Sequence, residues 1–164
     1  MQQALSSSLH FGVSIDAGHE TVTNTVIHFC HNTIYGCGWS GARRGANGAI
    51  HLVHLNRYTL HFANNIIVST GQPYLSGWSD RTIPPSQARN LWFGAGAPPA
   101  WDLAAIAADA RFMDAAHDNF RLQSNSPAID AGADVGIRTD FDGNRRPQGA
   151  GPDLGAYEFV KERD

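Results

Sequence analysis

Two histidines occupy the same place in a repeated stretch, and histidine is the side chain best suited to move a proton near neutral pH. His28 lies in VIHFCHNTIYG (26–36), and His61 lies thirty-three positions later in TLHFANNIIVS (59–69). An apolar or small residue flanks each His-Phe pair, so strand alternation turns both histidines outward when the phenylalanines face inward. We expect His28 and His61 to stack on one outer face as candidate acid–base groups. The alternative is a solvated histidine ladder without a chemical role.

Two long stretches rich in glycine or other turn-forming residues, 37–48 and 70–86, read as loops inserted between strands. Both carry aromatic and arginine side chains, which can hold a sugar ring and its carboxylate. Arg44 in the first loop is a candidate partner of the two histidines, because a guanidinium can stabilise a developing enolate. The predicted substrate-binding residues are Trp39, Arg43, Tyr74, Trp78 and Arg81. Alternatively, these are ordinary surface loops whose tryptophans pack down as lids.

The run DFDGN places oxygen-bearing side chains at alternate positions around a glycine, as at the start of a calcium-binding loop. It lacks the distal bidentate glutamate of an EF-hand. The predicted metal ligands are Asp140, Asp142, Asn144 and Asp153. The alternative is a structural Asx-turn, with Arg145 and Arg146 pairing the acids.

The elements that must position these residues are short strands. Residues 9–94 contain runs of four to eight residues rich in Val, Ile, Thr and aromatics, bounded by Gly, Asn or Asp. One stretch, 99–112, favours a short helix through its Ala, Leu and Ile content and the prolines at its start. The sequence therefore predicts an all-β chain with one short helix.

An asparagine recurs at Asn32, Asn65 and Asn90, each time followed by apolar residues. Removing the loop at 37–48 leaves a period in the low twenties, which indicates a solenoid of stacked coils. Asparagine tolerates a left-handed bend, and its amide can bond to the coil above and the coil below. Inward columns should place Ile27 over Leu60, and likewise one phenylalanine over the other. A coincidental pair of hairpins is the alternative.

Composition excludes several classes of function. The 164 residues carry a net charge of −3 and one lysine, Lys161, so nothing favours a nucleic-acid partner. No stretch approaches the ~20 apolar residues of a membrane span. The two cysteines, Cys30 and Cys37, are too few for a disulfide framework, although they could form one bridge.

Three blocks near the carboxyl terminus appear in order: FRLQSNSPAIDAG, DFDGNRRP and GPDLGAYE. Together they resemble the closing segment of right-handed parallel β-helix proteins of the pectate-lyase-like superfamily, and HNTIYG and NNIIVS are similar to coils of that family. The resemblance implies about three coils over residues 1–98. A short helix and an irregular C-terminal cap follow over 99–164, and we expect this cap to cover the open end of the solenoid. GAYEF reads as a last strand along the sheet.

Members of that family usually have more coils, so the upstream end here lacks an evident cap. We expect residues 1–8 or another chain to cover it, the latter by self-association. The amino terminus shows no signal-peptide pattern. We expect the chain to begin inside a larger architecture.

The resemblance also implies polysaccharide, often acidic, as the ligand, and a place outside the cytoplasm: extracellular, periplasmic or on the cell surface. Family enzymes cleave such polymers as lyases, often with Ca²⁺, or as hydrolases with paired carboxylates. The lone lysine lies in a polar tail, and the strands TVIHF, AIHLV and YTLHF contain no acid. Three functions therefore stay open: a polysaccharide lyase or hydrolase, a carbohydrate-binding or adhesin-like module, and a purely structural solenoid.

Overall fold

A computed structural model describes most of the chain, and strands dominate it. The described residues are 4–5, 13–15, 25–37, 48–52, 58–77, 89–94 and 96–161. Within them the one helical element is a 3₁₀ turn, η3 (Ala115–His117), so the chain belongs to the all-β class, as predicted. Five predicted site residues lie outside the described residues: Trp39, Arg43, Arg44, Trp78 and Arg81.

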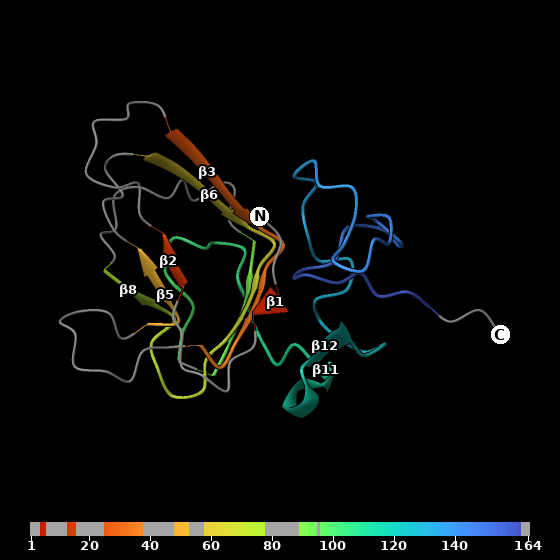
Figure 1. The fold of residues 1–164 in the computed structure, drawn as a ribbon, viewed down its shortest axis with the longest axis horizontal. Helices are drawn as coiled ribbons and strands as arrows, with labels where there is room; N and C mark the ends of the chain where they lie inside the picture. The colour runs from red at the N-terminus through yellow and green to blue at the C-terminus, as the bar shows by residue number, and fades with distance from the viewer. Residues whose placement is uncertain are drawn as a thin grey trace.

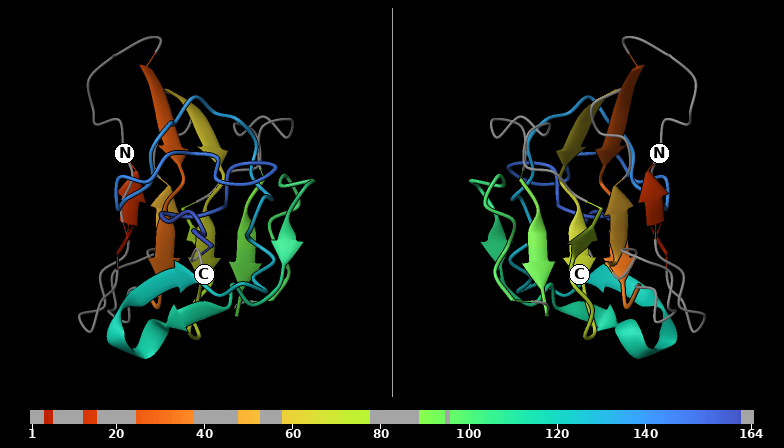
Figure 2. Two further views of the ribbon diagram at one scale, coloured as in Figure 1. Left: turned by 90° about the vertical axis from the view of Figure 1, so that its right-hand side faces the viewer. Right: turned by 90° about the vertical axis from the view of Figure 1, so that its left-hand side faces the viewer.

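Three sheets consist of parallel strands only. One sheet has the order β1 (Ala4–Leu5), β4 (Thr33–Tyr35), β7 (Ile66–Val68), β9 (Leu91–Phe93), β10 (Ile106–Ala107). A second has the order β2 (Val13–Ile15), β5 (Ile50–Leu52), β8 (Leu75–Ser76). The third pairs β3 (Thr25–Cys30) with β6 (Tyr58–Ala63). The first sheet appears face-on in Figure 2, with β1 in red at one edge. The chain thus passes through the sheets in the same order twice, from β2 to β4 and from β5 to β7.

The repeated stretches pair in the predicted register. Ile27 lies opposite Leu60, and Phe29 lies opposite Phe62 with stacked rings 5.1 Å apart. The Phe62 ring also stacks on Trp92, with 5.9 Å between the ring centroids. This aromatic column belongs to the core enclosed by the three sheets, and Figure 1 shows the sheets around that interior. The alternative of two coincidental hairpins is wrong, because β3 and β6 run parallel.

The repeated asparagines form a buried ladder across the bends that follow β3 and β6. Asn65 Oδ1 accepts hydrogen bonds from the backbone N–H and from Nδ2 of Asn32, both at 2.9 Å. Asn90 Oδ1 accepts the same pair of bonds from Asn65, also at 2.9 Å. The ladder ends at Asp102, whose carboxylate accepts from Asn90 Nδ2 at 2.9 Å. A carboxylate has no proton to donate, so it ends a chain of donors that all point the same way.

The left-handed conformation lies one residue earlier than we predicted. His31 (φ 54°) and Asn64 (φ 58°) adopt it, rather than the ladder asparagines that follow them. The bend thus divides two tasks between neighbours: one residue turns the backbone, and the next bonds to the adjacent strand.

Residues 99–112 contain turns and β10 but no helix, so the predicted helix is wrong. Two observations give the physical reason. The Ile106 N–H donates to Asn90 O at 2.9 Å, which adds β10 to the sheet, and the Trp101 side chain is buried in the core. Tertiary pairing therefore outweighs the helix propensity of this alanine-rich stretch. An antiparallel hairpin follows, formed by β11 (Phe112–Asp114) and β12 (Asn119–Leu122).

The C-terminal segment, residues 128–159, covers the outer face of the five-stranded sheet and not an end of the stack. In Figure 1 it lies beside the sheets, and in the left view of Figure 2 it crosses in front of the strands. Strand alternation explains the contact: Ile67 and Trp92 face the inner core, whereas Ile66 and Leu91 face outward against Leu154. Our expectation that this segment closes the open end is therefore corrected.

GAYEF forms no strand, also contrary to prediction. Instead, the backbone N–H of Gly155 donates to Asn64 O at 2.8 Å, and that of Ala156 donates to Thr33 Oγ1 at 3.0 Å. A Cβ on Gly155 (φ 84°) would lie 2.7 Å from Ile66 Cδ1 and from Thr33 Oγ1. The backbone approaches the sheet too closely for a side chain at this position.

Candidate functional site

One groove in the described part of the chain lies between the five-stranded sheet and the β11–β12 hairpin. Its volume is about 500 Å³. We call it the hairpin groove and define it by the side chains that the argument uses: Tyr35, Phe93, Asp109, Arg111, Gln123 and Asn125. Aromatic rings, a guanidinium, a carboxylate and amides therefore line one cavity.

Strand ends and the hairpin hold these groups in place. Tyr35 ends β4 and packs against Phe112 and Phe120, with ring centroids 6.1 Å and 5.3 Å away. Phe93 ends β9 and is 41% exposed, so one ring is open to a ligand. Arg111 has a left-handed backbone (φ 54°), and its N–H donates to Asp109 Oδ1 at 2.9 Å.

A second groove of about 370 Å³, which we call the histidine groove, lies on the outer face of β3 and β6. His28 and His61 stack here as predicted, with ring centroids 4.7 Å apart and ring planes within 7°. Cys30 and Ala63 continue the same face, and the loop 133–135 forms the opposite wall.

Asp134 in this wall is tied to its own loop. Its Oδ1 accepts from Gly136 N at 2.8 Å, and Arg138 Nη1 donates to both carboxylate oxygens at 3.0 Å. These contacts lower the pKa of the Asp134 carboxyl, the Gly136 hydrogen bond most of all. The groove therefore contains a carboxylate at neutral pH.

Both cysteines are free thiols and buried, so the bridge between Cys30 and Cys37 that we left open does not form. The Cys30 Sγ donates to His61 O at 3.8 Å. Burial raises the pKa of this thiol. It therefore stays protonated near neutral pH and is a poor nucleophile and a poor metal ligand.

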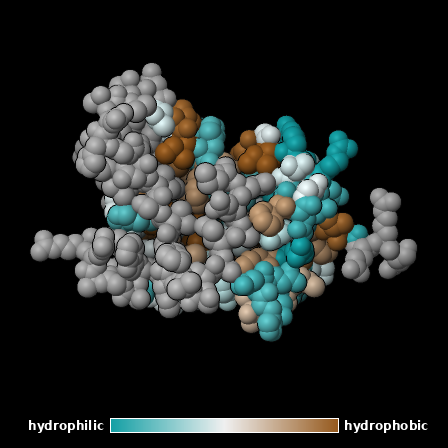
Figure 3. Space-filling view, viewed as in Figure 1, coloured by the Kyte–Doolittle hydropathy of each residue, from teal (hydrophilic) through white to brown (hydrophobic). Residues whose placement is uncertain are grey.

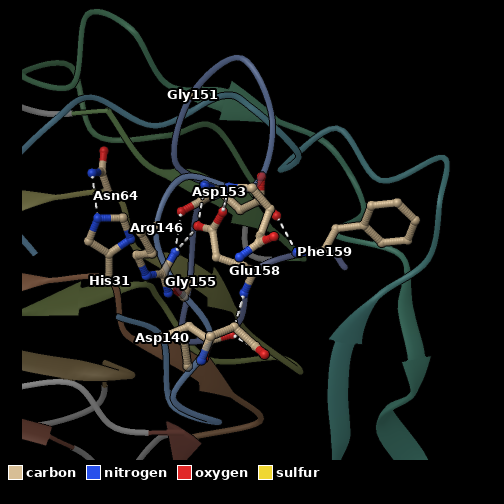
Figure 4. Close-up of polar contacts among 12 residues, drawn as sticks. His31, Asn64, Asp140, Arg146, Gly151, Asp153, Gly155, Glu158 and Phe159 are labelled. Atoms are coloured by element: carbon tan, nitrogen blue, oxygen red, sulfur yellow. Dashed lines mark hydrogen bonds and ion pairs between the residues drawn. The ribbon is translucent and has the colours of Figure 1, made fainter. Parts of the chain in front are cut away.

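A buried polar network joins the C-terminal segment to the bend after β3 (Figure 4). Arg146 and Glu158 form an ion pair of 2.5 Å, both side chains fully shielded from solvent. Arg146 also donates to the carbonyl oxygens of Asp153 and Gly155, at 3.0 Å and 2.8 Å. Burial raises the pKa of Asp153 to about 6. This network positions the segment and is closed to a substrate.

His31 lies at the inner end of the same network. Its Nε2 contacts Asn64 Nδ2 at 2.9 Å, and Figure 4 shows the ring between Asn64 and Arg146. Because Asn64 Nδ2 can only donate, His31 Nε2 is the acceptor. Burial first, and the charge of Arg146 second, lower the pKa of His31 to about 3. The imidazole is therefore neutral at pH 7.

The four predicted metal ligands lie in the C-terminal segment, but the carboxylates of Asp140, Asp142 and Asp153 are engaged. Asp140 accepts from Asn144 N, Asn144 Nδ2 and Glu158 N, at 2.7 Å, 3.0 Å and 2.9 Å. Asp142 pairs with Arg121 at 2.8 Å. This arrangement does not fit a calcium ion without displacing several N–H donors. The bonds to Asp140 are those of the Asx-turn that we held as the alternative; Arg121 pairs with Asp142, whereas Arg146 pairs with Glu158.

Asp153 accepts backbone N–H groups of Asp130 and Phe159, at 2.7 Å and 2.5 Å. Within the described residues no three His, Cys, Asp or Glu side chains converge as metal ligands. Calcium binding stays a prediction, and a melting measurement with and without chelator tests it.

Tyr74, predicted to bind substrate, is 5% exposed and packs edge-on against Trp92 in the core. His28 and His61 thus lie together in the structure, whereas Tyr74 lies in the core. Sequence reasoning missed the hairpin groove. Its polar residues Asp109, Arg111 and Asn125 carry no recognisable spacing, and only the pairing of β11 with β12 assembles them.

The remaining surface gives little further guidance. In the view of Figure 3, hydrophilic side chains cover most of the described C-terminal part, and hydrophobic ones appear in separate places. The described residues include no helix with the length and apolar character of a membrane span. No protein-family model matches the chain, and no curated protein and no solved structure is significantly similar to it.

Proposed function

We propose that the three parallel sheets are the faces of a right-handed parallel β-helix, the architecture of the pectate-lyase-like superfamily. The support is the repeated order of strands, the matching registers of β3 with β6 and of β4 with β7, and the asparagine ladder. Such a stack needs identical bends in successive coils, and the ladder supplies them.

We propose further that the chain is a carbohydrate-binding module that takes polysaccharide outside the cytoplasm. The observation that carries this proposal is the hairpin groove, which combines an exposed Phe93 ring with the Arg111 guanidinium and side-chain amides. Aromatic faces pack on sugar rings, amides bond to hydroxyl groups, and a guanidinium pairs with a uronate carboxylate. A groove of about 500 Å³ has room for a few sugar units.

A glycan array and calorimetry with uronate oligosaccharides test this function. Arg111→Ala should weaken binding about tenfold or more, which is the size of one lost charge-assisted hydrogen bond. Phe93→Ala should weaken it about tenfold or more as well, because it removes the apolar face on which a sugar ring would pack. Met113→Ala is the matched control: it changes an exposed apolar residue on the same hairpin that does not line the groove. Retained affinity in both groove variants would refute the hairpin groove as the glycan site, and no glycan bound at all would leave the structural-scaffold alternative.

Polysaccharide cleavage is the second candidate, favoured by the paired imidazoles of His28 and His61 in the histidine groove. The predicted helper, Arg44, comes from residues outside the described part. Incubation with uronate polymers should yield unsaturated products if the chain is a lyase, or new reducing ends if it is a hydrolase. Loss of either product on His61→Ala, with glycan binding intact, would assign cleavage to this pair.

A further inference from the structure

The two histidines of the histidine groove are held side by side by the strands beneath them. His28 and His61 are directly opposite in the parallel register. One residue further along, Phe29 and Phe62 stack on the inner face with an interplanar angle of 12°. Because the phenylalanines are packed in the core, the backbone that carries the imidazoles has little freedom to separate them.

The spacing of the rings suits joint coordination of one ion. Metal–nitrogen bonds are about 2.0–2.1 Å, so two nitrogens on one ion lie about 3 Å apart. The ring centroids are 4.7 Å apart and nearly parallel. The rings must therefore approach by about 1.7 Å and turn so that their in-plane nitrogen lone pairs converge, and the broad χ2 torsion of histidine permits this turn at the exposed His28.

We propose that His28 and His61 form a two-histidine clamp for a divalent transition-metal ion of the imidazole-preferring kind, such as Cu²⁺, Ni²⁺ or Zn²⁺. The Asp134 carboxylate lines the same groove, but its charge is paired with Arg138 and its oxygens are bonded within its own loop. Cys30 is not a ligand, because its thiol is protonated and donates to a backbone carbonyl. Within the described residues no third His, Cys, Asp or Glu side chain converges with the two imidazoles.

This ion is chemically distinct from the calcium that the family resemblance implies. Calcium takes oxygen ligands, whereas neutral imidazole selects later first-row metals. Affinity should follow the general order for nitrogen sites, with Cu²⁺ bound more tightly than Ni²⁺ or Zn²⁺. The clamp is independent of the proposed glycan site, which lies in the other groove.

Isothermal titration of the full chain with Ni²⁺, Zn²⁺ and Ca²⁺ chlorides tests the proposal. The variants are His28→Ala and His61→Ala, with His117→Ala as the matched control on η3. The clamp predicts one ion per chain for Ni²⁺ and Zn²⁺, no calcium heat from this groove, and at least tenfold weaker binding in each clamp variant. His117→Ala should titrate as the unaltered chain does. Electron paramagnetic resonance of the Cu²⁺ form should show two coordinated nitrogens, reduced to one in either variant.

Circular dichroism spectra of the variants and of the unaltered chain show whether the variants fold. The spectra should be the same, because both imidazoles point away from the core. His28→Gln provides a second, more conservative variant. Full-strength binding in both clamp variants would place the metal on other histidines and overturn the proposal. The absence of any saturable binding by Ni²⁺ and Zn²⁺ would overturn it as well.

Discussion

Asn65→Ala should lower stability strongly, because Asn65 is the middle rung of the asparagine ladder. Four hydrogen bonds depend on this side chain: two accepted by Oδ1 from Asn32, and two donated by Nδ2 to Asn90 Oδ1 and Phe29 O. At a net value of about 1 kcal/mol each, their loss amounts to about 4 kcal/mol. Two of these bonds serve the Asn32 N–H and the Phe29 carbonyl, and an alanine side chain offers neither group a new hydrogen-bond partner.

Urea unfolding, followed by circular dichroism, measures this effect directly. For an m value of about 2 kcal/mol/M, a loss of 4 kcal/mol lowers the midpoint by about 2 M. Asn125→Ala is the matched control, because the Asn125 side chain is exposed and it is the backbone carbonyl of this residue that accepts a bond from Arg111. The control should change the midpoint by less than about 0.3 M, corresponding to an exposed-site effect within about 0.5 kcal/mol. A midpoint loss for Asn65→Ala no larger than that of the control would refute the ladder as a source of stability.

Four further predictions concern the C-terminal segment and the bend after β3 that it covers. Glu158→Gln should lower the free energy of unfolding by about 3–5 kcal/mol, because it leaves the buried Arg146 charge without its partner. In denaturant titrations, the double variant with Arg146→Met should lose less stability than the sum of the two single variants. His31 has a folded-state pKa of about 3, below its unfolded value, so the unfolded state binds the extra proton. The free energy of unfolding should therefore fall as pH drops from about 6.5, by about 2 kcal/mol at pH 5. His31→Gln should remove this pH dependence. The pH dependence that Asp153 contributes has the opposite sign, because its folded-state pKa of about 6 exceeds the unfolded value. Its contribution to stability is therefore lost as pH rises from about 4 to 6. Asp153→Asn should remove that loss when unfolding curves are compared across this range. Gly155→Ala should loosen the segment from the sheet, seen as faster amide exchange at Leu154 and Ala156 with β3 and β6 unchanged.

Much of the parallel architecture was predictable from the repeat alone. The matching positions of His-Phe and of Asn in 26–36 and 59–69 were enough to predict which residues pair, and β3 and β6 pair in that register. The reason is local and periodic: alternation sends Ile27 and Phe29 inward, and a ladder requires the same side chain at each level. The outward stacking of His28 and His61 followed from the same alternation.

Other features were decided by contacts between segments distant in sequence. The stretch 99–112 has helix-favouring residues, yet pairing of Ile106 with the sheet and burial of Trp101 make it irregular. The DFDGN run has a calcium-like spacing, but Arg121 and the backbone of Glu158 supply partners for its carboxylates. Spacing states which groups are near one another in the chain, and it cannot state which donors reach them in space.

The sequence by itself determined the all-β class, the register of the repeated strands and the asparagine column, because each depends on a short pattern repeated along the chain. Only the tertiary structure decided where residues 128–159 pack, which carboxylates are neutralised, and that Tyr35, Phe93 and Arg111 line one groove. These outcomes depend on the geometry with which a non-repeating segment meets the face of a sheet. No repeated pattern in the sequence predicts how that segment packs on the sheet.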